Sequence, residues 1–182
     1  MKTPETKARY EQEFRRIFSE WSGGDSRGVE LMRALMVSAR LLEVLADHKL
    51  QAVGLSVPRL GLLLWLYFEE RCGNPEGISP SALSQYQHIS KNTVSSLLAS
   101  LENEELIERV LCSEDRRSFK IRLTRAGRSR VSSTLPKHGA FAADAFASLT
   151  VEEQKTLLQL LGNLRHSLHQ QVSGREFGSY KT

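Results

Sequence analysis

The stretch from Leu83 to Gly127, LSQYQHISKNTVSSLLASLENEELIERVLCSEDRRSFKIRLTRAG, decides the fold that we expect for this chain. Just before it, Ser79-Pro80 is typical of a helix start, because serine caps free N–H groups and proline suits the first turn. A short helix, Ser81 to about Tyr86, then leads through a tight connection to Ser90, a second N-cap. Four apolar residues follow at helical spacing: Val94, Leu97, Leu98 and Leu101. Two short helices joined by a turn predict a helix-turn-helix.

A β-hairpin is expected directly after the second helix. Residues 107–112 are rich in strand-forming side chains, and residues 119–123 alternate apolar with basic residues at period two. The polar loop between them, residues 113–118, carries Arg116 and Arg117. A helix-turn-helix followed by a basic-tipped hairpin is a winged helix, so we expect a mainly α fold with a small β-hairpin wing. A helix fits the major groove of DNA and a narrow hairpin tip fits the minor groove.

The hairpin region concentrates positive charge. From Ile107 to Arg130 the sequence has eight basic and three acidic residues, whereas the whole chain has a net charge of only +4. Such a segment is a candidate face for binding nucleic acid. An ordinary solvated hairpin remains the alternative.

Helices flank the winged helix on both sides. Val57-Pro58 begins a helix that is apolar on every side until Glu69, which predicts a central core helix. After residues 125–135, Pro136 is expected to interrupt the chain before a weaker helix over 137–147. We divide the chain into an extension helix over 1–25, dimerisation helices over 26–52 and 137–170, the core helix and winged helix over 53–135, and a flexible tail over 171–182. Thr150 and Glu153 form a capping box that opens the leucine-rich last helix.

The first 25 residues predict a helix over Pro4 to Trp21. Its aromatic and aliphatic stripe consists of Tyr10, Phe14, Ile17, Phe18 and Trp21. A helix of this length is marginal alone in water, so we expect it to pack on the dimerisation helices, against the partner subunit. A loosely tethered arm is the alternative.

Composition excludes several classes of protein. With 182 residues, 40% hydrophobic and 25% charged, the chain fits one globular domain or one domain plus an arm. The two cysteines, Cys72 and Cys112, form no disulfide framework, and we expect them to be buried and inert. The longest apolar run, Leu60 to Phe68, cannot span a bilayer and no signal peptide is evident, so the cytoplasm is expected. We recognise no enzyme or metal-site motif, and expect neither cofactor nor membrane contact.

Three motifs at specific spacing make the chain resemble the MarR (multiple antibiotic resistance regulator) family. They are IS-x-x-TV at 89–94, LE-x-x-x-LIER at 101–109, and D-x-R with a following LT-x-x-G at 115–127. The resemblance implies a homodimer whose terminal helices interleave, pseudo-palindromic operators, and usually repression relieved by a small aromatic or phenolic effector. Family members often carry glycine where this chain has His88 and Glu105, so a left-handed backbone is expected there with some strain.

The candidate DNA-binding residues lie on the helix-turn-helix and the hairpin tip. Asparagine suits adenine, whereas serine, threonine and lysine suit phosphates or base edges. Arg117 is expected in the minor groove with Asp115 orienting it, and Arg116 on a phosphate. For Thr93 we weigh a second role, supporting the first turn of its helix. The full set is Ser81, Ser90, Lys91, Asn92, Thr93, Ser95, Ser96, Asp115, Arg116 and Arg117.

Two readings stay open. Arg59, Trp65, Tyr67 and Phe68 on the core helix are candidates for an effector pocket, or they are plain core. A second function, from another class, is a winged-helix protein-interaction module without DNA binding. It is favoured by the serine-rich second helix, which has Ser96 where the family often has arginine.

Overall fold

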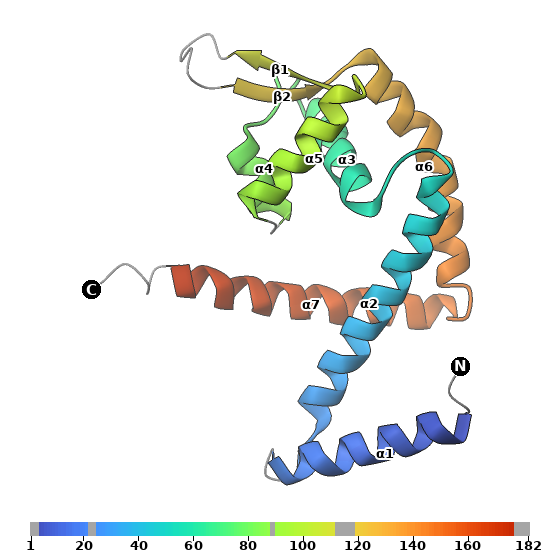
Figure 1. The fold of residues 1–182 in the computed structure, drawn as a ribbon. Helices are drawn as coiled ribbons and strands as arrows, with labels where there is room; N and C mark the ends of the chain where they lie inside the picture. Colours follow the sequence, from blue (N-terminus) through green and yellow to red (C-terminus); the bar gives the residue numbers. More distant parts are fainter. Residues whose placement is uncertain (1–3, 22–24, 88–89, 112–118, 177–182) are drawn as a thin grey trace. The chain divides into compact units, whose positions relative to one another are not determined.

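A computed structural model describes residues 4–21, 25–87, 90–111 and 119–176 of the chain. The chain divides into two compact units, Met1–Thr134 and Leu135–Thr182. The first unit contains the winged helix and the second contains the last long helix (Figure 1). Among the described residues, no helix is both long and apolar enough to cross a membrane.

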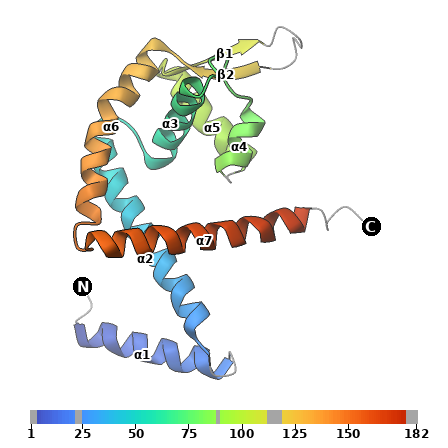
Figure 2. The same ribbon diagram turned by 180° about the vertical axis from the view of Figure 1, so that it is seen from behind.

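The winged helix is built on three helices: α3 (Val57–Arg71), α4 (Pro80–Gln87) and α5 (Lys91–Asn103). Opposite views show α5 lying between α4 and α3 (Figures 1 and 2). The expected start signals are present, since the Ser79 hydroxyl accepts a hydrogen bond from the Ala82 N–H at 3.2 Å. The predicted helix-turn-helix is therefore confirmed, although His88 and Ile89 in the turn lie outside the described residues.

The wing is an antiparallel pair, β1 (Ile107–Leu111) and β2 (Phe119–Leu123), in which Arg109 is opposite Ile121. Ile78, just before α4, pairs with Ile121 on the other side of β2 through two backbone hydrogen bonds of 2.8 and 2.9 Å. Gly77 has φ +93°, and a Cβ there would lie 2.2 Å from the Ile121 carbonyl oxygen. The wing is thus attached to the chain that leads into α4.

The core of this unit lies between the three helices and the hairpin. Four leucines of α3 are buried (Leu60, Leu62, Leu63 and Leu66), but the helix is not buried on every side, because its other residues are half-buried or exposed and Phe68 is 50% exposed. In α5 the buried face consists of Val94, Leu98 and Leu101, and Leu97 is only half-buried. The largest fully buried side chains of the winged helix are Leu62, Leu63, Leu83, Leu98, Leu101, Ile121 and Leu123.

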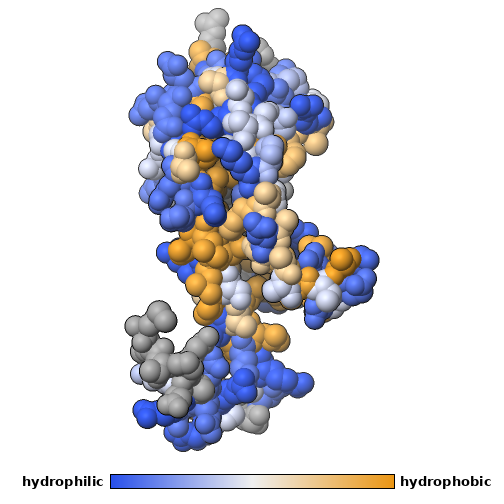
Figure 3. Space-filling model, turned by 90° about the vertical axis from the view of Figure 1, so that its right-hand side faces the viewer, coloured by the Kyte–Doolittle hydropathy of each residue, from blue (hydrophilic) through white to orange (hydrophobic). Residues whose placement is uncertain are grey.

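Two helices precede the winged helix: α1 (Pro4–Trp21), the predicted extension, and α2 (Arg27–Gln51). Near its end α2 is anchored, with Ala46 and Leu50 buried, whereas every residue from 31 to 41 is exposed. This exposed part includes Leu31, Met36 and Leu41 at 71%, 64% and 59% exposure. Figure 3 shows hydrophobic side chains gathered over the middle of the face turned toward the viewer.

The expected break at Pro136 is wrong, because α6 is one helix from Arg125 to Ala145 with Pro136 inside it. Proline removes one helical hydrogen bond, to the carbonyl of Ser132. Both Ser132 and Pro136 are exposed, so water can bond this carbonyl and the helix continues.

The last helix, α7, runs from Val151 to Glu176. Its predicted capping box is confirmed, because Glu153 accepts from the Thr150 N–H at 2.8 Å and donates its own N–H to the Thr150 hydroxyl at 3.3 Å. The helix continues five residues beyond Gln171, where we had expected the flexible tail to begin. Gly174 did not end it, since one glycine in a helix costs only about 1 kcal/mol.

Cys72 is exposed at the end of α3, so the expectation of a buried thiol is wrong for this residue. It is the C-cap of the helix, where the chain turns into Gly73 at φ +98° and leaves the core. Cys112 lies outside the described residues.

Candidate nucleic-acid interface

The start of α5 is a well-formed cap. Ser90 has extended backbone angles (φ −62°, ψ 150°), and its hydroxyl accepts the Thr93 N–H at 3.1 Å. The hydroxyls of Ser90 and Thr93 also lie 2.7 Å apart. The second role that we weighed for Thr93, supporting the first turn, is therefore present. Free N–H groups at a helix start carry partial positive charge and suit a phosphate.

A polar stripe covers the outer side of α5. Because Val94, Leu98 and Leu101 face the core, the opposite side points to solvent. The sequence also placed Asn103 on this side, at i+11 from Asn92, but it missed Ala99, which continues the stripe at i+7. The predicted DNA-binding residues that the structure places here, all exposed, are Ser90, Lys91, Asn92, Thr93, Ser95 and Ser96.

The other predicted contacts do not all join this stripe. Ser81 is exposed on the first turn of α4, the helix that packs beside α5. Asp115, Arg116 and Arg117 lie outside the described residues. The described interface is thus the exposed side of the first two turns of α5 with the start of α4.

Below the hairpin tip, most basic side chains are paired with carboxylates. Arg109 lies 2.8 Å from Glu102 and stacks over the Phe119 ring, with its guanidinium carbon 4.8 Å from the ring centroid. Lys120 lies 2.7 Å from Glu76, and this ammonium group lowers the pKa of the Glu76 carboxyl. The charge at the base of the hairpin is therefore compensated within the chain.

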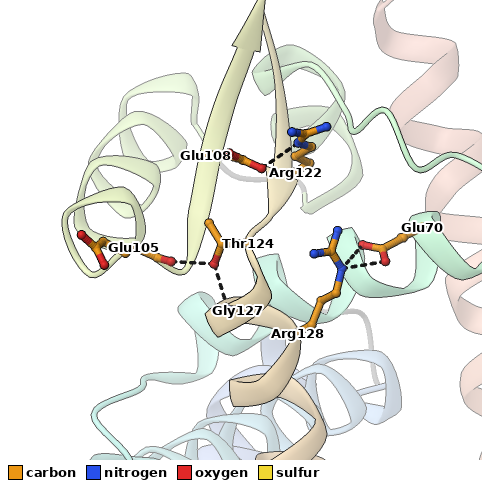
Figure 4. A network of polar contacts seen from close by, with 7 residues as sticks. All are labelled: Glu70, Glu105, Glu108, Arg122, Thr124, Gly127 and Arg128. Carbon is orange, nitrogen blue, oxygen red and sulfur yellow. Dashed lines mark hydrogen bonds and ion pairs between the residues drawn. The ribbon is translucent and has the colours of Figure 1, made fainter.

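Two further pairs are visible in Figure 4, where Arg122 points toward Glu108 and Arg128 toward Glu70. Both N···O distances are 2.7 Å. The hydrogen bond to Glu70 raises the pKa of the Arg128 guanidinium, which thus joins α6 to the last turn of α3. Four of the eight basic residues in 107–130 are engaged in this way. For Lys120 and Arg128 the sequence gives no local signal, because their partners, Glu76 and Glu70, lie more than 40 residues away.

One corner sets the direction of the hairpin relative to α5 and α6. Glu105 has φ +56°, the left-handed backbone expected at this position. The Thr124 hydroxyl donates to the Glu105 carbonyl at 2.6 Å and accepts the Gly127 N–H at 3.0 Å (Figure 4). A Cβ on Gly127 would lie 2.0 Å from the Leu106 carbonyl oxygen. The LT-x-x-G motif is therefore a positioning element for the wing.

The four candidate effector residues spread along α3 and do not share one face. Arg59 is near the start of the helix, where its Nη1 donates to the Gly54 carbonyl at 2.8 Å and its Nη2 lies 2.5 Å from Glu104. Tyr67 is in the last turn, where its hydroxyl accepts from Arg71 at 2.9 Å. Nine residues, about 13 Å of helix, separate Arg59 from Phe68. Trp65 lies between them and is half-buried. Because the four side chains are spread in this way, an effector pocket that they share stays a prediction.

Comparison with known proteins gives consistent results. The model of the MarR family matches residues 53–118. The chain is similar to the HTH-type transcriptional repressor YetL of Bacillus subtilis (strain 168), with 25% identity over 77% of this chain and 81% of that protein. It is 30% identical to an uncharacterized HTH-type transcriptional regulator, YdgJ, of the same organism, over 64% of this chain and 67% of that one.

A solved structure extends this likeness to the fold. Sco3205, a MarR family transcriptional regulator from Streptomyces coelicolor crystallised in complex with DNA, superposes with a TM-score of 0.70. The two sequences are 27% identical, and the match covers 79% of this chain and 89% of that chain.

Proposed function

The chain belongs to the MarR family of transcriptional regulators, and from this premise we propose that it is a repressor that binds a pseudo-palindromic operator as a homodimer. We further propose that a small aromatic or phenolic effector releases it. It is a regulator and not an enzyme. The observation that carries the proposal is the exposed polar stripe of α5, which begins at the capped helix start at Ser90.

In the proposed complex α5 enters the major groove, which is wide enough to admit a helix. Lys91 and the free N–H groups of the first turn face a phosphate. Asn92 reads adenine, and Ser95 and Ser96 contact base edges or phosphates. Arg117 enters the minor groove and Arg116 contacts a phosphate, as the D-x-R motif implies. The Thr124 corner and the ion pairs of Arg109, Lys120 and Arg122 hold the hairpin base in place for these contacts.

A homodimer is supported by the exposed apolar part of α2. Monomeric soluble proteins rarely expose contiguous apolar patches larger than a few hundred Å². The eight large apolar side chains of α2 that are 40–71% exposed present on the order of 800 Å², which is one partner's share of a standard interface. A two-fold dimer presents two copies of α5 to two half-sites, which accounts for a pseudo-palindromic operator.

A matched pair of asparagines on α5 tests the DNA-binding proposal. Asn92 lies in the first turn and Asn103 is the last residue, and both are exposed. Asn92→Ala should weaken binding to DNA from upstream of the chain's own gene by about 1–3 kcal/mol, the value of one good base contact. Fluorescence anisotropy on labelled duplex measures this. The DNA affinity of Asn103→Ala should stay within about twofold of that of the parent chain. Equal effects of the two variants would contradict the assignment of the start of α5 to base contacts.

A protein-interaction module without DNA binding is the second candidate. The compensated charge at the hairpin base favours it, because four basic side chains already have carboxylate partners. This candidate predicts no salt-dependent binding to any duplex fragment. The proposed repressor, in contrast, should bind one duplex sequence with much higher affinity than the others.

A further inference from the structure

The connection from α2 into α3, residues 52–56, is tied to the helices around it by charged side chains. Asp47 of α2 accepts the backbone N–H at the start of α3 at 2.6 Å. Arg130 of α6 and Arg59 of α3 each donate to a backbone carbonyl of the connection, both at 2.8 Å. Leu55 anchors the same segment in the core, where it is only 3% exposed. The end of α2 therefore has a defined direction relative to the start of α3.

Arg59 also reaches the far end of α5. Its Nη1 bonds the Gly54 carbonyl in the connection, and its Nη2 lies 2.5 Å from the carboxylate of Glu104, the C-cap of α5. The Arg59 side chain is 15% exposed, and its Nε is buried without a hydrogen-bond acceptor among the described residues. One guanidinium thus joins the connection that follows α2 to the C-terminal end of α5.

The C-terminal end of α5 is acidic, which a helix alone does not favour. Glu102, Glu104 and Glu105 lie in or just after its last turn, which contains no basic residue. The C-terminus of a helix carries partial negative charge, so carboxylates there are destabilising. Arg109 of the wing compensates Glu102 at 2.8 Å, and Arg59 of α3 compensates Glu104. These glutamates therefore act as attachment points for α5 in the fold.

The contact of Arg59 with Glu104 contributes little to stability. A buried guanidinium loses its hydration, and this loss offsets much of the attraction to a carboxylate. The Glu104 side chain is 42% exposed and Gly54 is exposed, so water can solvate both groups when the guanidinium is removed. A methionine at position 59 can fill the same space with a flexible apolar chain. What the guanidinium adds is a fixed direction between the elements that it joins.

We propose that Arg59 is a positioning residue for operator binding, which fixes the angle between α2 and α5. The inference rests on the proposed homodimer, in which α2 belongs to the dimer contact and α5 enters the major groove. The angle between these helices sets the distance between the two copies of α5. That distance has to match the separation of the two half-sites, one helical turn of DNA or a multiple of it. Arg59 thereby determines which half-site spacing the dimer accepts.

The preference for one half-site spacing is the property to measure. The probe is the duplex that the parent chain protects from cleavage in DNA upstream of its own gene, beside the same duplex with one base pair inserted at its centre. The insertion moves one half-site by about 3.4 Å and turns it by about 35°. By fluorescence anisotropy the parent chain should prefer the first duplex by about tenfold or more, the effect of losing a base contact. Arg59→Met should reduce this preference to about threefold or less.

Arg71→Met is the matched control, the same substitution at the other end of α3. The Arg71 guanidinium bonds the Tyr67 hydroxyl of its own helix at 2.9 Å, so this variant should keep the preference of the parent chain. A third duplex, with one half-site scrambled, separates positioning from folding. Arg59→Met should bind it within about twofold of the parent chain, because a single copy of α5 docks without regard to spacing. Its melting temperature should also stay within about 3 °C of the parent value.

Glu104→Ala tests the partner of Arg59. It should reduce the spacing preference as Arg59→Met does, and the double variant should be no worse than either single variant, because both substitutions remove one contact. Additive losses would contradict the assigned contact.

The outcomes separate this inference from the proposed function. If the parent chain protects no site in the upstream DNA, the proposed function fails and the inference fails with it. If the parent chain binds its site but accepts both spacings equally, or if Arg59→Met keeps the parent preference, the inference alone is overturned. An equal loss of affinity of Arg59→Met for all three duplexes overturns it as well, since that result indicates damage to α5 itself.

Discussion

Gly127 sits where the hairpin passes into α6, with no room for a side chain. Its N–H bonds the Thr124 hydroxyl at 3.0 Å, and a Cβ would lie 2.0 Å from the Leu106 carbonyl oxygen. The Leu106 carbonyl belongs to the backbone, which cannot move aside as the end of a flexible side chain can. Gly127→Ala should therefore lower the free energy of unfolding by about 3 kcal/mol or more, as measured by urea denaturation.

Gly139 on the same helix provides the control. No atom lies within 4 Å of the position that its Cβ would occupy. Gly139→Ala should be neutral or stabilise the chain by up to about 1 kcal/mol, because alanine is the better helix former. Equal losses from the two variants would show that the corner is not as close as the structure has it.

Residues that act locally could be predicted, and those that act across the fold could not. The caps at Ser79, Ser90 and Thr150 depend on the next three residues, so each was readable from sequence. The partners of Lys120 and Arg128 depend on how β2 and α6 lie against α3 and the segment that follows it, which no local pattern contains. Leu97 illustrates the same limit, since helical spacing alone did not distinguish it from the fully buried Leu98.

At the scale of elements, the winged helix followed from spacing and turn residues. The continuous α6 helix could not be predicted in this way. Pro136 leaves one backbone carbonyl without its N–H donor, and the helix continues only if water can reach that carbonyl. The hairpin was predicted in the correct strands, but its third partner, Ile78, was not. A single bridging residue gives no periodic signal.

The capping box of α7 predicts a pH dependence. Hydrogen bonds from the Thr150 N–H and hydroxyl lower the pKa of the Glu153 carboxyl in the folded state. A lowered carboxyl pKa contributes stability that is present above the unfolded value, about 4.3, and lost as the pH falls below it. The thermal stability of the parent chain should therefore fall through this range by more than that of Glu153→Gln.

The readout is the difference between two pH titrations of the melting temperature, followed by circular dichroism. Glu152→Gln is the control, because the Glu152 carboxylate takes no part in the capping box. It should keep the pH dependence of the parent chain. If Glu153→Gln also keeps the pH dependence of the parent chain, the carboxylate of the capping box does not contribute to stability.

At the scale of the whole molecule, two exposed apolar surfaces need an explanation. One runs along α2 and the other along α7. Helical periodicity showed that both helices are amphipathic or apolar, but what covers them is a property of the assembly and not of one chain. The homodimer proposed above assigns a cover to both.

The charge distribution of the whole molecule restricts where DNA can bind. The sequence concentrates basic residues in 107–130, yet Arg109, Lys120, Arg122 and Arg128 have carboxylate partners. In the proposed complex, the contacts with phosphates come chiefly from Lys91, the start of α5 and the hairpin tip. We expect a moderate number of such contacts for each protomer.

The salt dependence of operator binding tests the central claim most directly. The claim is that a dimer binds one DNA sequence through α5 and the hairpin tip. Affinity for DNA from upstream of its own gene is measured by anisotropy at several salt concentrations, beside a scrambled duplex. With Lys91 and Arg116 of both protomers on phosphates, log K should fall against log salt with a slope of about −3.6 or steeper. The scrambled duplex should bind at least about a thousandfold more weakly. A flat slope, or equal affinity for the two duplexes, would contradict the account.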